Sequence, residues 1–377
     1  MSKHKVAIVH YWLTGMRGGE AVLEALCRMF PSADLFTHVY NQNAASPTIN
    51  KHTVTTTFID RLPFANRLYA HYLPLMPIAL EGLDLTSYDL VISSEAGPAK
   101  GVITAPGSVH ICYTHSPMRY IWDQYHVYRK EASWFARILM PVFAHHLRIW
   151  DESSAARVDG YIANSNHVAN RVRKYYRREA IVIPPPVAIN QFTPESTERV
   201  EDFYLWAGEL VSYKRPSIAI DAFTVMNKPL VVIGGGKPSR ELISRAGKNI
   251  TFLGRVPHDV LKDHMARCRA LVFPGEEDFG IVPIEVMASG RPVIAYSKGG
   301  AVDTVVDGVT GLLFDDQSVE GLVKAVQHFE SEMLHTIDQQ ALAEHARNFD
   351  ENHFRERVSV YLNEFGIDAD NYAVDGK

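Results

Sequence analysis

The segment ALVFPGEEDFGIVPIEVMASGRPVIAY, residues 270–296, holds a strand, an acidic loop, a helix and a second strand in close succession. A short apolar run ends near Pro274, and Pro283 suits the first turn of the helix that follows the acidic loop. Gly290 ends that helix just before the next apolar run. Strand, helix and strand in this order are the repeating unit of a parallel α/β sheet.

The same alternation runs along the rest of the chain. Helical periodicity, as in Glu20–Phe30 and Pro216–Asn227, separates short runs that read as strands ending in small or polar residues. These runs are KVAIVH, DLFTHVY, DLVISSE, HICYTH and GYIANS in the first half, and FYLWAGE, PLVVIGGG, ITFLGRV, ALVFPG, PVIAYS and GLLF in the second. We therefore predict parallel, doubly wound sheets.

A chain of 377 residues is too long for one typical core and predicts two domains. The proline-rich stretch VIPPPVAINQFTP, residues 182–194, cannot form a helix and predicts an extended linker between them. We expect two Rossmann-like domains facing each other across a cleft, with ligands at the carboxyl ends of the strands. The expected divisions are residues 1–186, residues 187–350, and a C-terminal helix with a polar tail, 351–377, that crosses back to the first domain.

Composition excludes several classes of protein. Apolar residues make up 46% and charged residues 21%, values that disordered chains do not have. A net charge of −5 argues against nucleic acid as the partner. Cys27, Cys112 and Cys268 lie far apart, which is typical of free thiols in a reducing compartment. Met1 leads almost directly into a strand, and the longest apolar run, residues 68–80, is too short to span a bilayer, so we expect a cytoplasmic protein.

The acidic loop raises a question of charge. Glu276, Glu277 and Asp278 precede the helix, and Glu285 lies within it, although the helix start offers unpaired amides that suit a phosphate. Acids near a helix N-terminus can simply complement its dipole. That explanation accounts for one carboxylate, but it leaves the others and Glu285 unexplained.

Basic and glycine-rich loops follow other strands of the second half. Lys214 and Arg215 precede a helix that begins at Pro216, where they could neutralise a diphosphate or form a solvated charge pair. Gly234–Gly236 end a buried strand where the backbone must come close to a ligand or to a neighbouring helix.

Two loops of the first half also end strands. Gly18 and Gly19 precede a helix and could meet an anion or form only a turn. His115 follows the strand HICYT, with Arg119 close behind it, and could be structural or functional. The glycine pattern is not GxGxxG, which argues against a dinucleotide-dependent oxidoreductase.

Metal and membrane signals are weak. The single Asp-X-Asp, residues 368–370, lies in the tail rather than after a strand, so we predict no essential metal and no cofactor. The stretches at residues 61–80 and 171–178 mix basic with aromatic or apolar residues. Each could be a solvated helix face, or could contact an anionic membrane.

Taken together, these motifs resemble the retaining glycosyltransferases of family 4, which have the GT-B fold. The resemblance covers nearly the whole chain and rests on RGGE, ANSNHVANRVRKYY followed by IPPPV, GELVSYKR, FLGRV and EDFGIVPIE. Within the family, HICYTHSPMRYIWD and YDLVISSEAGPAKGV look most like bacterial O-antigen and exopolysaccharide mannosyltransferases that use GDP-mannose. One departure is Glu209, where the family often has arginine.

The resemblance implies how the second half would hold the donor. Glu277 would accept hydrogen bonds from the sugar hydroxyls, Glu285 would bind the ribose, and Lys214 would neutralise the leaving diphosphate, from across the cleft. The remaining contacts would be Arg215 at the diphosphate, Phe279, Gly280, Ile281 and Val282 at the sugar and diphosphate, and Arg255 and Val256 at the base.

In the first half, Gly18 and Gly19 would form the loop under the diphosphate. His115 would contact the reacting sugar, and Arg119 would bind substrate at the rim of the cleft.

The resemblance implies hexosyl transfer with retention of configuration, with mannose from GDP-mannose as the first choice. The acceptor would be a lipid-linked or other oligosaccharide in cell-surface polysaccharide synthesis, at the inner face of the membrane. The alternatives are a transferase that uses a UDP-sugar and a non-catalytic protein that binds a nucleotide-sugar.

Overall fold

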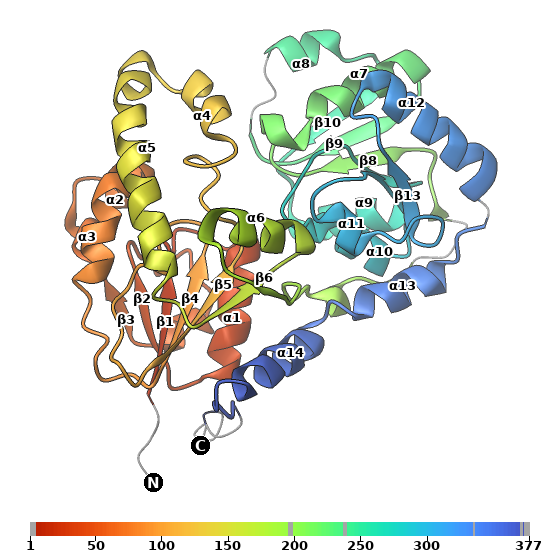
Figure 1. Ribbon diagram of the computed structural model, residues 1–377. Coiled ribbons are helices and arrows are strands. Elements are labelled where there is room, and N and C mark those ends of the chain that lie inside the picture. The colour runs from red at the N-terminus through yellow and green to blue at the C-terminus, as the bar shows by residue number, and fades with distance from the viewer. Residues whose placement is uncertain (1–4, 195–198, 237–239, 335, 370–371, 373–377) are drawn as a thin grey trace. The chain divides into compact units, whose positions relative to one another are not determined.

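A computed structural model describes residues 5–194, 199–236, 240–334, 336–369 and 372 (Figure 1). The chain divides into two compact units. The first unit comprises residues 1–186 and 354–377, and the second comprises residues 187–353.

The first unit contains a seven-stranded sheet in which every neighbouring pair is parallel. Its spatial order is β3-β2-β1-β4-β5-β6-β7, so the chain reverses direction across the sheet beside β1. The strands are β1 (Val6–His10), β2 (Asp34–Thr37), β3 (Val54–Thr56), β4 (Leu90–Glu95), β5 (Val109–Thr114), β6 (Gly160–Ala163) and β7 (Ile181–Val182).

The second unit contains a six-stranded parallel sheet in the order β10-β9-β8-β11-β12-β13. The strands are β8 (Tyr204–Ala207), β9 (Leu230–Ile233), β10 (Ile250–Gly254), β11 (Leu271–Phe273), β12 (Val293–Tyr296) and β13 (Gly311–Phe314). Both orders are of the doubly wound kind, which places ligands at the carboxyl ends of the strands.

Alternate residues of the central strands enter different cores, because each sheet is covered on both faces. In β1, Val6 and Ile8 pack with α1 (Gly18–Met29), whereas Ala7 and Val9 pack in a second cluster. In β8, Leu205 and Tyr204 likewise enter different clusters. The predicted pair of doubly wound, Rossmann-like parallel sheets is therefore confirmed.

Helices connect the strands in both units (Figure 1). Those of the first unit, after α1, are α2 (Ala65–Leu68), α3 (Met76–Glu81), α4 (Tyr125–Glu131), α5 (Trp134–Ala155), α6 (Asn166–Tyr176) and α14 (Glu351–Asn363), with 3₁₀ turns η1 (Ile49–Lys51), η2 (Phe58–Arg61) and η3 (Tyr69–Leu75). Those of the second unit are α7 (Pro216–Met226), α8 (Arg240–Arg245), α9 (His258–Arg267), α10 (Ile281–Ala288), α11 (Ala301–Thr304), α12 (Val319–His328) and α13 (Gln339–Arg347), with η4 (Ile189–Gln191), η6 (Ser212–Lys214) and the π-helical turn η7 (Phe329–Met333).

The C-terminal helix α14 packs on the first unit, although it follows the second unit in the sequence. Its buried side chains Phe354, Val358 and Leu362 join the cluster that contains Ile8 of β1. An apolar stripe at spacings of three and four residues explains this, because it lies on one face of a helix.

Two details differ from the sequence-based expectation. The edge strands β3 and β7 were not predicted, since each is only two or three residues long. The proline-rich stretch expected to be an extended linker is partly buried, with Ile183 and Val187 almost inaccessible, and it contains the turn η4. Proline excludes an α-helix there, but it does not exclude burial of the segment.

Candidate functional site

Lys214 and Glu277 form an ion pair at the carboxyl edge of the second unit's sheet. Lys214 ends η6 after β8, and Glu277 lies in the loop between β11 and α10. The Lys214 ammonium donates to Glu277 Oε2 over 2.6 Å, and each side chain is 15% exposed. Both residues belong to one unit, which corrects the expectation that Lys214 acts on the acidic loop's ligand from across a cleft. Because the pair is reachable from solvent, a ligand with its own charges can exchange with either partner.

Glycines let the loops of this edge approach closely. A Cβ at Gly275 would lie 2.7 Å from Lys214 Cα, and a Cβ at Gly299 would lie 2.3 Å from the Glu277 carbonyl oxygen. The Gly300 N–H also donates to that carbonyl over 2.8 Å. Side chains of any size at these positions would therefore push the Lys214 and Glu277 backbones apart.

The glycine run after β9 lies against other loops of the same edge. A Cβ at Gly234 would lie 1.6 Å from the Gly208 carbonyl oxygen, and one at Gly235 would lie 2.8 Å from Arg255 Nη2. From the sequence, the close neighbour of this glycine run could be either a ligand or a helix. The structure shows the loop that follows β8 and the Arg255 guanidinium instead. Val256, next in the chain, packs on the core of the second unit.

The helix α10 begins at this edge, at Ile281. Gly280 precedes it with φ of +90°, a left-handed conformation that favours glycine, and Phe279 is buried. Pro283 stands in the first turn, as predicted, and Ile281 and Val282 are half-buried. The first-turn N–H groups have no partner within the helix and carry its positive dipole end, so they suit an anionic group.

Glu285 is half-buried one turn further along α10. Burial raises the pKa of its carboxyl group to about 7, because the charged form loses hydration there. Glu285 therefore differs from Glu277, whose carboxylate is paired with a cation. A ligand that donates hydrogen bonds to Glu285 would favour the ionised form.

His115 and Gly19 lie together at the carboxyl edge of the first unit's sheet. The Ser94 hydroxyl at the end of β4 is 2.9 Å from His115 Nε2. A Cβ at Gly19 would lie 2.3 Å from the Tyr11 hydroxyl and 3.6 Å from His115 Nε2. Asn164 further fixes the loop by donating to the His115 carbonyl over 2.9 Å. These contacts leave room only for glycine at position 19.

Gly18 begins a helix of the first unit, and Arg119 lies in one of its connecting segments. Gly18 is the first residue of α1, where the Glu20 carboxylate already accepts from the Arg17 N–H over 3.0 Å. Arg119 is half-buried in the segment between β5 and α4, four positions after His115 in the chain.

A buried charge cluster in the first unit was not identified from the sequence. Lys100 donates to Glu95 Oε1 over 2.9 Å, to Asp151 and to the Tyr176 hydroxyl over 3.3 Å. The side chains of Lys100, Glu95 and Asp151 are inaccessible to solvent, and Trp122 Nε1 also donates to Asp151, over 2.7 Å. The nearby carboxylates raise the pKa of Lys100 despite its burial. Glu95 and Lys100 are five positions apart, but Asp151 and Tyr176 lie far away in the sequence, so no local motif indicates the cluster.

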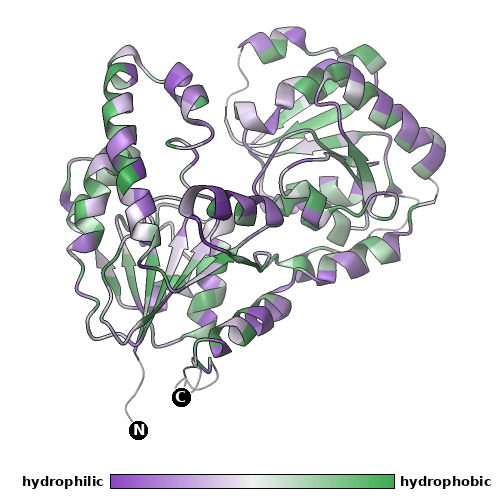
Figure 2. Cartoon of the chain, viewed as in Figure 1, coloured by the Kyte–Doolittle hydropathy of each residue, from purple (hydrophilic) through white to green (hydrophobic). Residues whose placement is uncertain are grey.

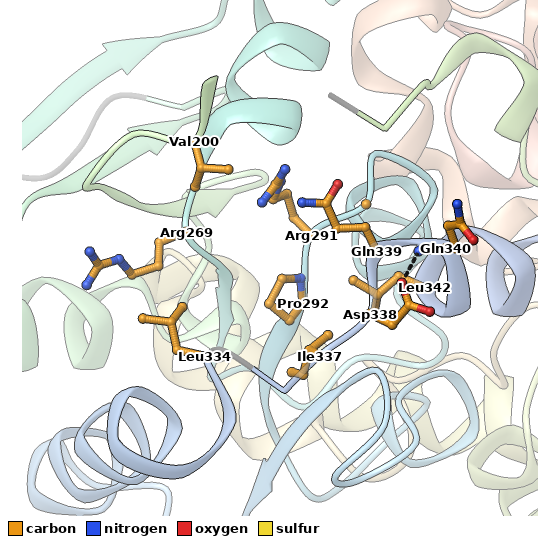
Figure 3. A pocket seen from close by; sticks show the side chains of 11 residues that line it. Val200, Arg269, Arg291, Pro292, Leu334, Ile337, Asp338, Gln339, Gln340 and Leu342 are labelled. Atoms are coloured by element: carbon orange, nitrogen blue, oxygen red, sulfur yellow. Dashed lines mark hydrogen bonds between the residues drawn. The ribbon is translucent and has the colours of Figure 1, made fainter. Parts of the chain in front are cut away.

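A cavity of about 640 Å³ lies in the second unit, and Figure 3 shows its lining. Arg269 and Pro292 line it just before β11 and β12, so it lies at the amino ends of these strands. Arg269 is already bridged to Asp202 and Glu330. None of the residues expected to bind substrate lines this cavity, which is separate from the loops that hold Lys214 and Glu277.

The described part of the chain contains neither a metal-binding cluster nor a membrane-spanning helix. Within the described ranges, no group of three or more histidine, cysteine, aspartate or glutamate side chains could hold a metal ion. Asp370, the last residue of the tail Asp-X-Asp, lies outside those ranges. None of the helices in the described part of the chain is both long and apolar enough to cross a bilayer.

Two family models match the chain. "Glycosyltransferase Family 4" matches residues 16–191, and "Glycosyl transferases group 1" matches residues 190–351. An uncharacterized glycosyltransferase of Methanocaldococcus jannaschii is 32% identical over 175 residues, which are 45% of this chain and 48% of that protein. The O-antigen chain mannosyltransferase C of Escherichia coli is 29% identical over 193 residues, 46% of this chain and 52% of that protein.

Solved structures extend the likeness to the whole fold. The Anabaena HepE protein, in a crystal structure with UDP and glucose, superposes with a TM-score of 0.69 at 16% identity, covering 96% of this chain and 99% of that one. The two parallel-sheet units and the superposition show the GT-B fold, and the two family models place the chain among the glycosyltransferase families. The chain belongs to glycosyltransferase family 4. It spans about half the length of the curated relatives that it matches.

Proposed function

We propose that this protein transfers mannose from GDP-mannose, with retention of configuration, to a lipid-linked or other oligosaccharide acceptor in cell-surface polysaccharide synthesis. The Lys214–Glu277 pair beside the start of α10 is the observation that carries the proposal. It places one cation, helix amides and a carboxylate at the carboxyl edge of one sheet. A diphosphate needs the first two, and sugar hydroxyls need the third.

Binding of the donor would divide the ion pair between two parts of the ligand. The diphosphate takes the Lys214 ammonium and the first-turn amides of α10, with Arg215 adding charge. Glu277, released from lysine, accepts hydrogen bonds from the sugar hydroxyls, and Glu285 accepts from the ribose. The remaining roles follow the family resemblance: Phe279, Gly280, Ile281 and Val282 line the sugar and diphosphate, Arg255 and Val256 line the base, Gly18 and Gly19 lie under the diphosphate, His115 contacts the reacting sugar, and Arg119 binds substrate.

The reaction breaks the bond between the anomeric carbon and the diphosphate oxygen and forms a bond from that carbon to an acceptor oxygen. Positive charge develops on the sugar and negative charge on the leaving diphosphate. Lys214 and the α10 amides stabilise that negative charge without rearrangement during the reaction. The acceptor attacks from the face that the diphosphate leaves, and a phosphate oxygen takes the acceptor's proton. No metal or cofactor is part of this proposal.

The similarity to the O-antigen chain mannosyltransferase supports mannose. The Anabaena structure that contains UDP and glucose favours a second candidate, a transferase that uses a UDP-sugar. A third reading is a protein that binds a nucleotide-sugar without turning it over.

A thermal-shift screen across GDP-, UDP- and ADP-sugars separates the donor candidates, since a ligand that binds only the folded state raises the melting temperature. GDP-mannose should give the largest rise. A larger rise in melting temperature with a UDP-sugar would show that the donor is a UDP-sugar and not GDP-mannose. Proton NMR of the transferred sugar then reads the anomeric configuration. An inverted product would overturn retention, and a donor that binds but is never consumed would leave only a binding protein.

The proposed partners follow from the lipid-linked acceptor. The enzyme would be a peripheral cytoplasmic protein that meets this acceptor at the inner face of an anionic membrane, and nucleic acid would not be among its partners. Of the two segments considered from sequence, 171–178 is a poor candidate for lipid contact. Arg171 is buried on Ser116 and Asp123, and Arg173 is paired with Glu179.

A further inference from the structure

Helix α5 exposes a continuous apolar face that the described part of the first unit leaves uncovered. Trp134 is 74% exposed, Phe135 60%, Ile138 63% and Val142 57%. Trp134, Ile138 and Val142 recur at spacings of four along α5, and Phe135 lies three positions before Ile138, so the four lie on one side of the helix. The buried residues of α5 begin only at Ala144. Its N-terminal half is therefore apolar toward solvent, and Figure 2 shows the hydrophobic colouring along α5.

An apolar groove of about 320 Å³ runs beside this face. It lies between α5, the turn η3 and the segment at Tyr120 and Ile121. Other exposed apolar side chains come from the same region of the sequence as η3, including Phe64, at 74%, and Ile78, at 66%. A face of this extent is unusual for a protein that meets only water and marks an interaction surface.

The charge of the surrounding chain selects the partner. Residues 132–150 contain Arg137, Arg148 and two histidines but no aspartate or glutamate, and residues 61–80 are also free of acids. The Arg137 guanidinium, on the same helix as Trp134 and Ile138, donates to the Lys130 and Ala132 carbonyls. Aromatic and aliphatic side chains next to basic ones are the composition of helices that lie in the interface of anionic bilayers.

We propose that the apolar face of α5 docks this protein on an anionic membrane, with Trp134, Phe135, Ile138 and Val142 in the interface and the groove open to the bilayer. This deepens the proposed function, on which it rests for the lipid-linked acceptor, by naming the surface that meets the lipid. Docking there brings the first unit to the membrane.

Vesicle co-sedimentation without donor tests the docking surface. The test variant is Phe135→Ser with Ile138→Ser and Val142→Ser, all on exposed positions. The control is Val225→Ser with Val360→Ser, which removes apolar side chains that are 72% and 60% exposed elsewhere. Wild type and control should bind phosphatidylglycerol vesicles, less so as salt rises, and should bind phosphatidylcholine vesicles weakly. The test variant should bind at least tenfold less at an unchanged melting temperature.

Equal binding of the test variant and wild type would overturn the proposal, as would failure of wild type to bind. Light scattering in the absence of lipid checks the competing occupant. A dimer that becomes a monomer in the test variant would mean that a second copy covers α5 instead. Because no donor is present, these outcomes stand whether or not the proposed sugar transfer is right.

A second observation concerns the imidazole of His115. His10, at the end of β1, lies opposite Ser94 of β4 in the sheet register. His10 Nδ1 is 3.0 Å from the Ser94 hydroxyl oxygen, which is 2.9 Å from His115 Nε2. His10 and Ser94 are almost completely buried, and His10 Nε2 finds no hydrogen-bond partner among the described residues.

The Ser94 hydroxyl has a single proton, so it can donate a hydrogen bond to only one of the two histidines. Burial lowers the pKa of His10 well below its usual value, so the His10 ring is neutral. A proton on Nε2 would be a buried N–H without an acceptor, which is rarely tolerated. The proton therefore sits on Nδ1 and is donated to Ser94, which donates its own proton to His115 Nε2.

We infer that His10 is a positioning residue that, through Ser94, holds His115 as the neutral tautomer with its proton on Nδ1. Protonation of His115 at Nε2 would make Ser94 accept from both rings, and its own buried hydroxyl proton would then lack an acceptor among the described residues. The array thus disfavours the charged form of His115. The tautomer assigned to His115 does not depend on the proposed function. Only the effect of that tautomer on sugar transfer rests on the proposed contact between His115 and the sugar. Tyr11, Tyr113 and Glu20 are the titratable groups nearest by, and burial raises the pKa of each.

Nitrogen-15 NMR of the histidine rings reads the tautomer directly, independently of any activity. Wild type should show a protonated Nδ1 and a bare Nε2 at His115. His10→Leu and Ser94→Ala should lose that preference, whereas His10→Asn should keep it, because the asparagine amide can donate from the position of Nδ1. The acid limb of the transfer rate should move up by about one pH unit in His10→Leu and return in His10→Asn. A His115 proton on Nε2 in wild type, or no change in His10→Leu, would overturn the inference.

Discussion

Lys100 and Lys214 are both paired with carboxylates, and the two pairs differ in what surrounds them. Lys100 in the first unit contacts Glu95 and Asp151, with every side chain inaccessible to solvent. Lys214 in the second unit contacts Glu277, and both side chains are 15% exposed. The first cluster has its donors and acceptors committed to one another, so it serves the fold. The second is open at a loop edge, so its charges remain available to a ligand.

Removing Lys100 should have the largest effect on stability. Lys100→Ala leaves two buried carboxylates without their cation, which should lower the free energy of unfolding of the first unit by about 3–5 kcal/mol. Urea denaturation measures this. The matched control is Lys228→Ala, whose partly exposed pair with Glu330 should be worth less than about 1 kcal/mol. Equal losses in the two variants would erase the distinction between buried and accessible pairs.

Removing Lys214 should affect turnover and leave stability nearly unchanged. Lys214→Ala should lower turnover about 10²–10³-fold, because the leaving diphosphate loses its cation, while the melting temperature changes little. Steady-state kinetics and a thermal melt measure both quantities, with Lys228→Ala again as control. Unchanged turnover would show that Lys214 does not act on the leaving group, and a large loss of stability would make it a structural residue like Lys100.

A glycine pair sharpens the comparison by moving the Glu277 backbone. Gly299 and Gly308 both have positive φ, of +71° and +76°, but only Gly299 faces the Glu277 carbonyl, since nothing lies within 4 Å of a Cβ at Gly308. Alanine at either position strains the backbone by about 1–2 kcal/mol. Only Gly299→Ala should also lower turnover, by about tenfold, because it displaces Glu277 from Lys214. Kinetics of the two variants side by side decide this, and similar turnover in both would count against it.

Glu285 represents a third kind of carboxyl group, one buried without a cation. Its pKa of about 7 in the folded protein exceeds the usual 4.5, so between these values the folded state binds more protons than the unfolded state. Stability contributed by the neutral form is therefore present below about pH 4.5 and is lost as pH rises through 7. Glu285→Gln should remove this loss and raise the melting temperature at pH 8 by about 2–4 °C.

Thermal melts at pH 5 and pH 8 measure the effect of Glu285→Gln, and donor titrations at pH 8 complete the test. The variant should bind donor more weakly although it is more stable, because the ribose loses a charged acceptor. A variant that binds donor as tightly as wild type would remove Glu285 from the site.

The parts of the fold that the sequence predicted depend on local pattern. Strands such as VAIVH and helices such as α10 follow from runs of residues that are neighbours in the chain, and Pro283 marked the start of α10 correctly. The sequence also placed the loops bearing Lys214 and Glu277 after strands of the second half, but it did not show that the two side chains meet at one edge.

The missing parts depend on distant residues. Glu95 and Asp151 meet at Lys100 although 51 positions separate Lys100 from Asp151, and His10 meets Ser94 across 84 positions. A single sequence carries no signal for such pairs until the strand order is known. The burial of Arg171 within the basic run at residues 171–178 could not be predicted for the same reason, since the groups that bury it come from another segment.

The central claim is that Lys214 leaves Glu277 to bind the donor's diphosphate. Calorimetric binding of GDP and of guanosine to wild type and to Lys214→Ala tests it most directly, with the uridine pair used if the donor screen selects UDP-sugars. Wild type should bind the diphosphate far more tightly than the nucleoside, and Lys214→Ala should lose at least tenfold of that preference while its affinity for the nucleoside stays the same. An unchanged preference in Lys214→Ala would contradict the claim.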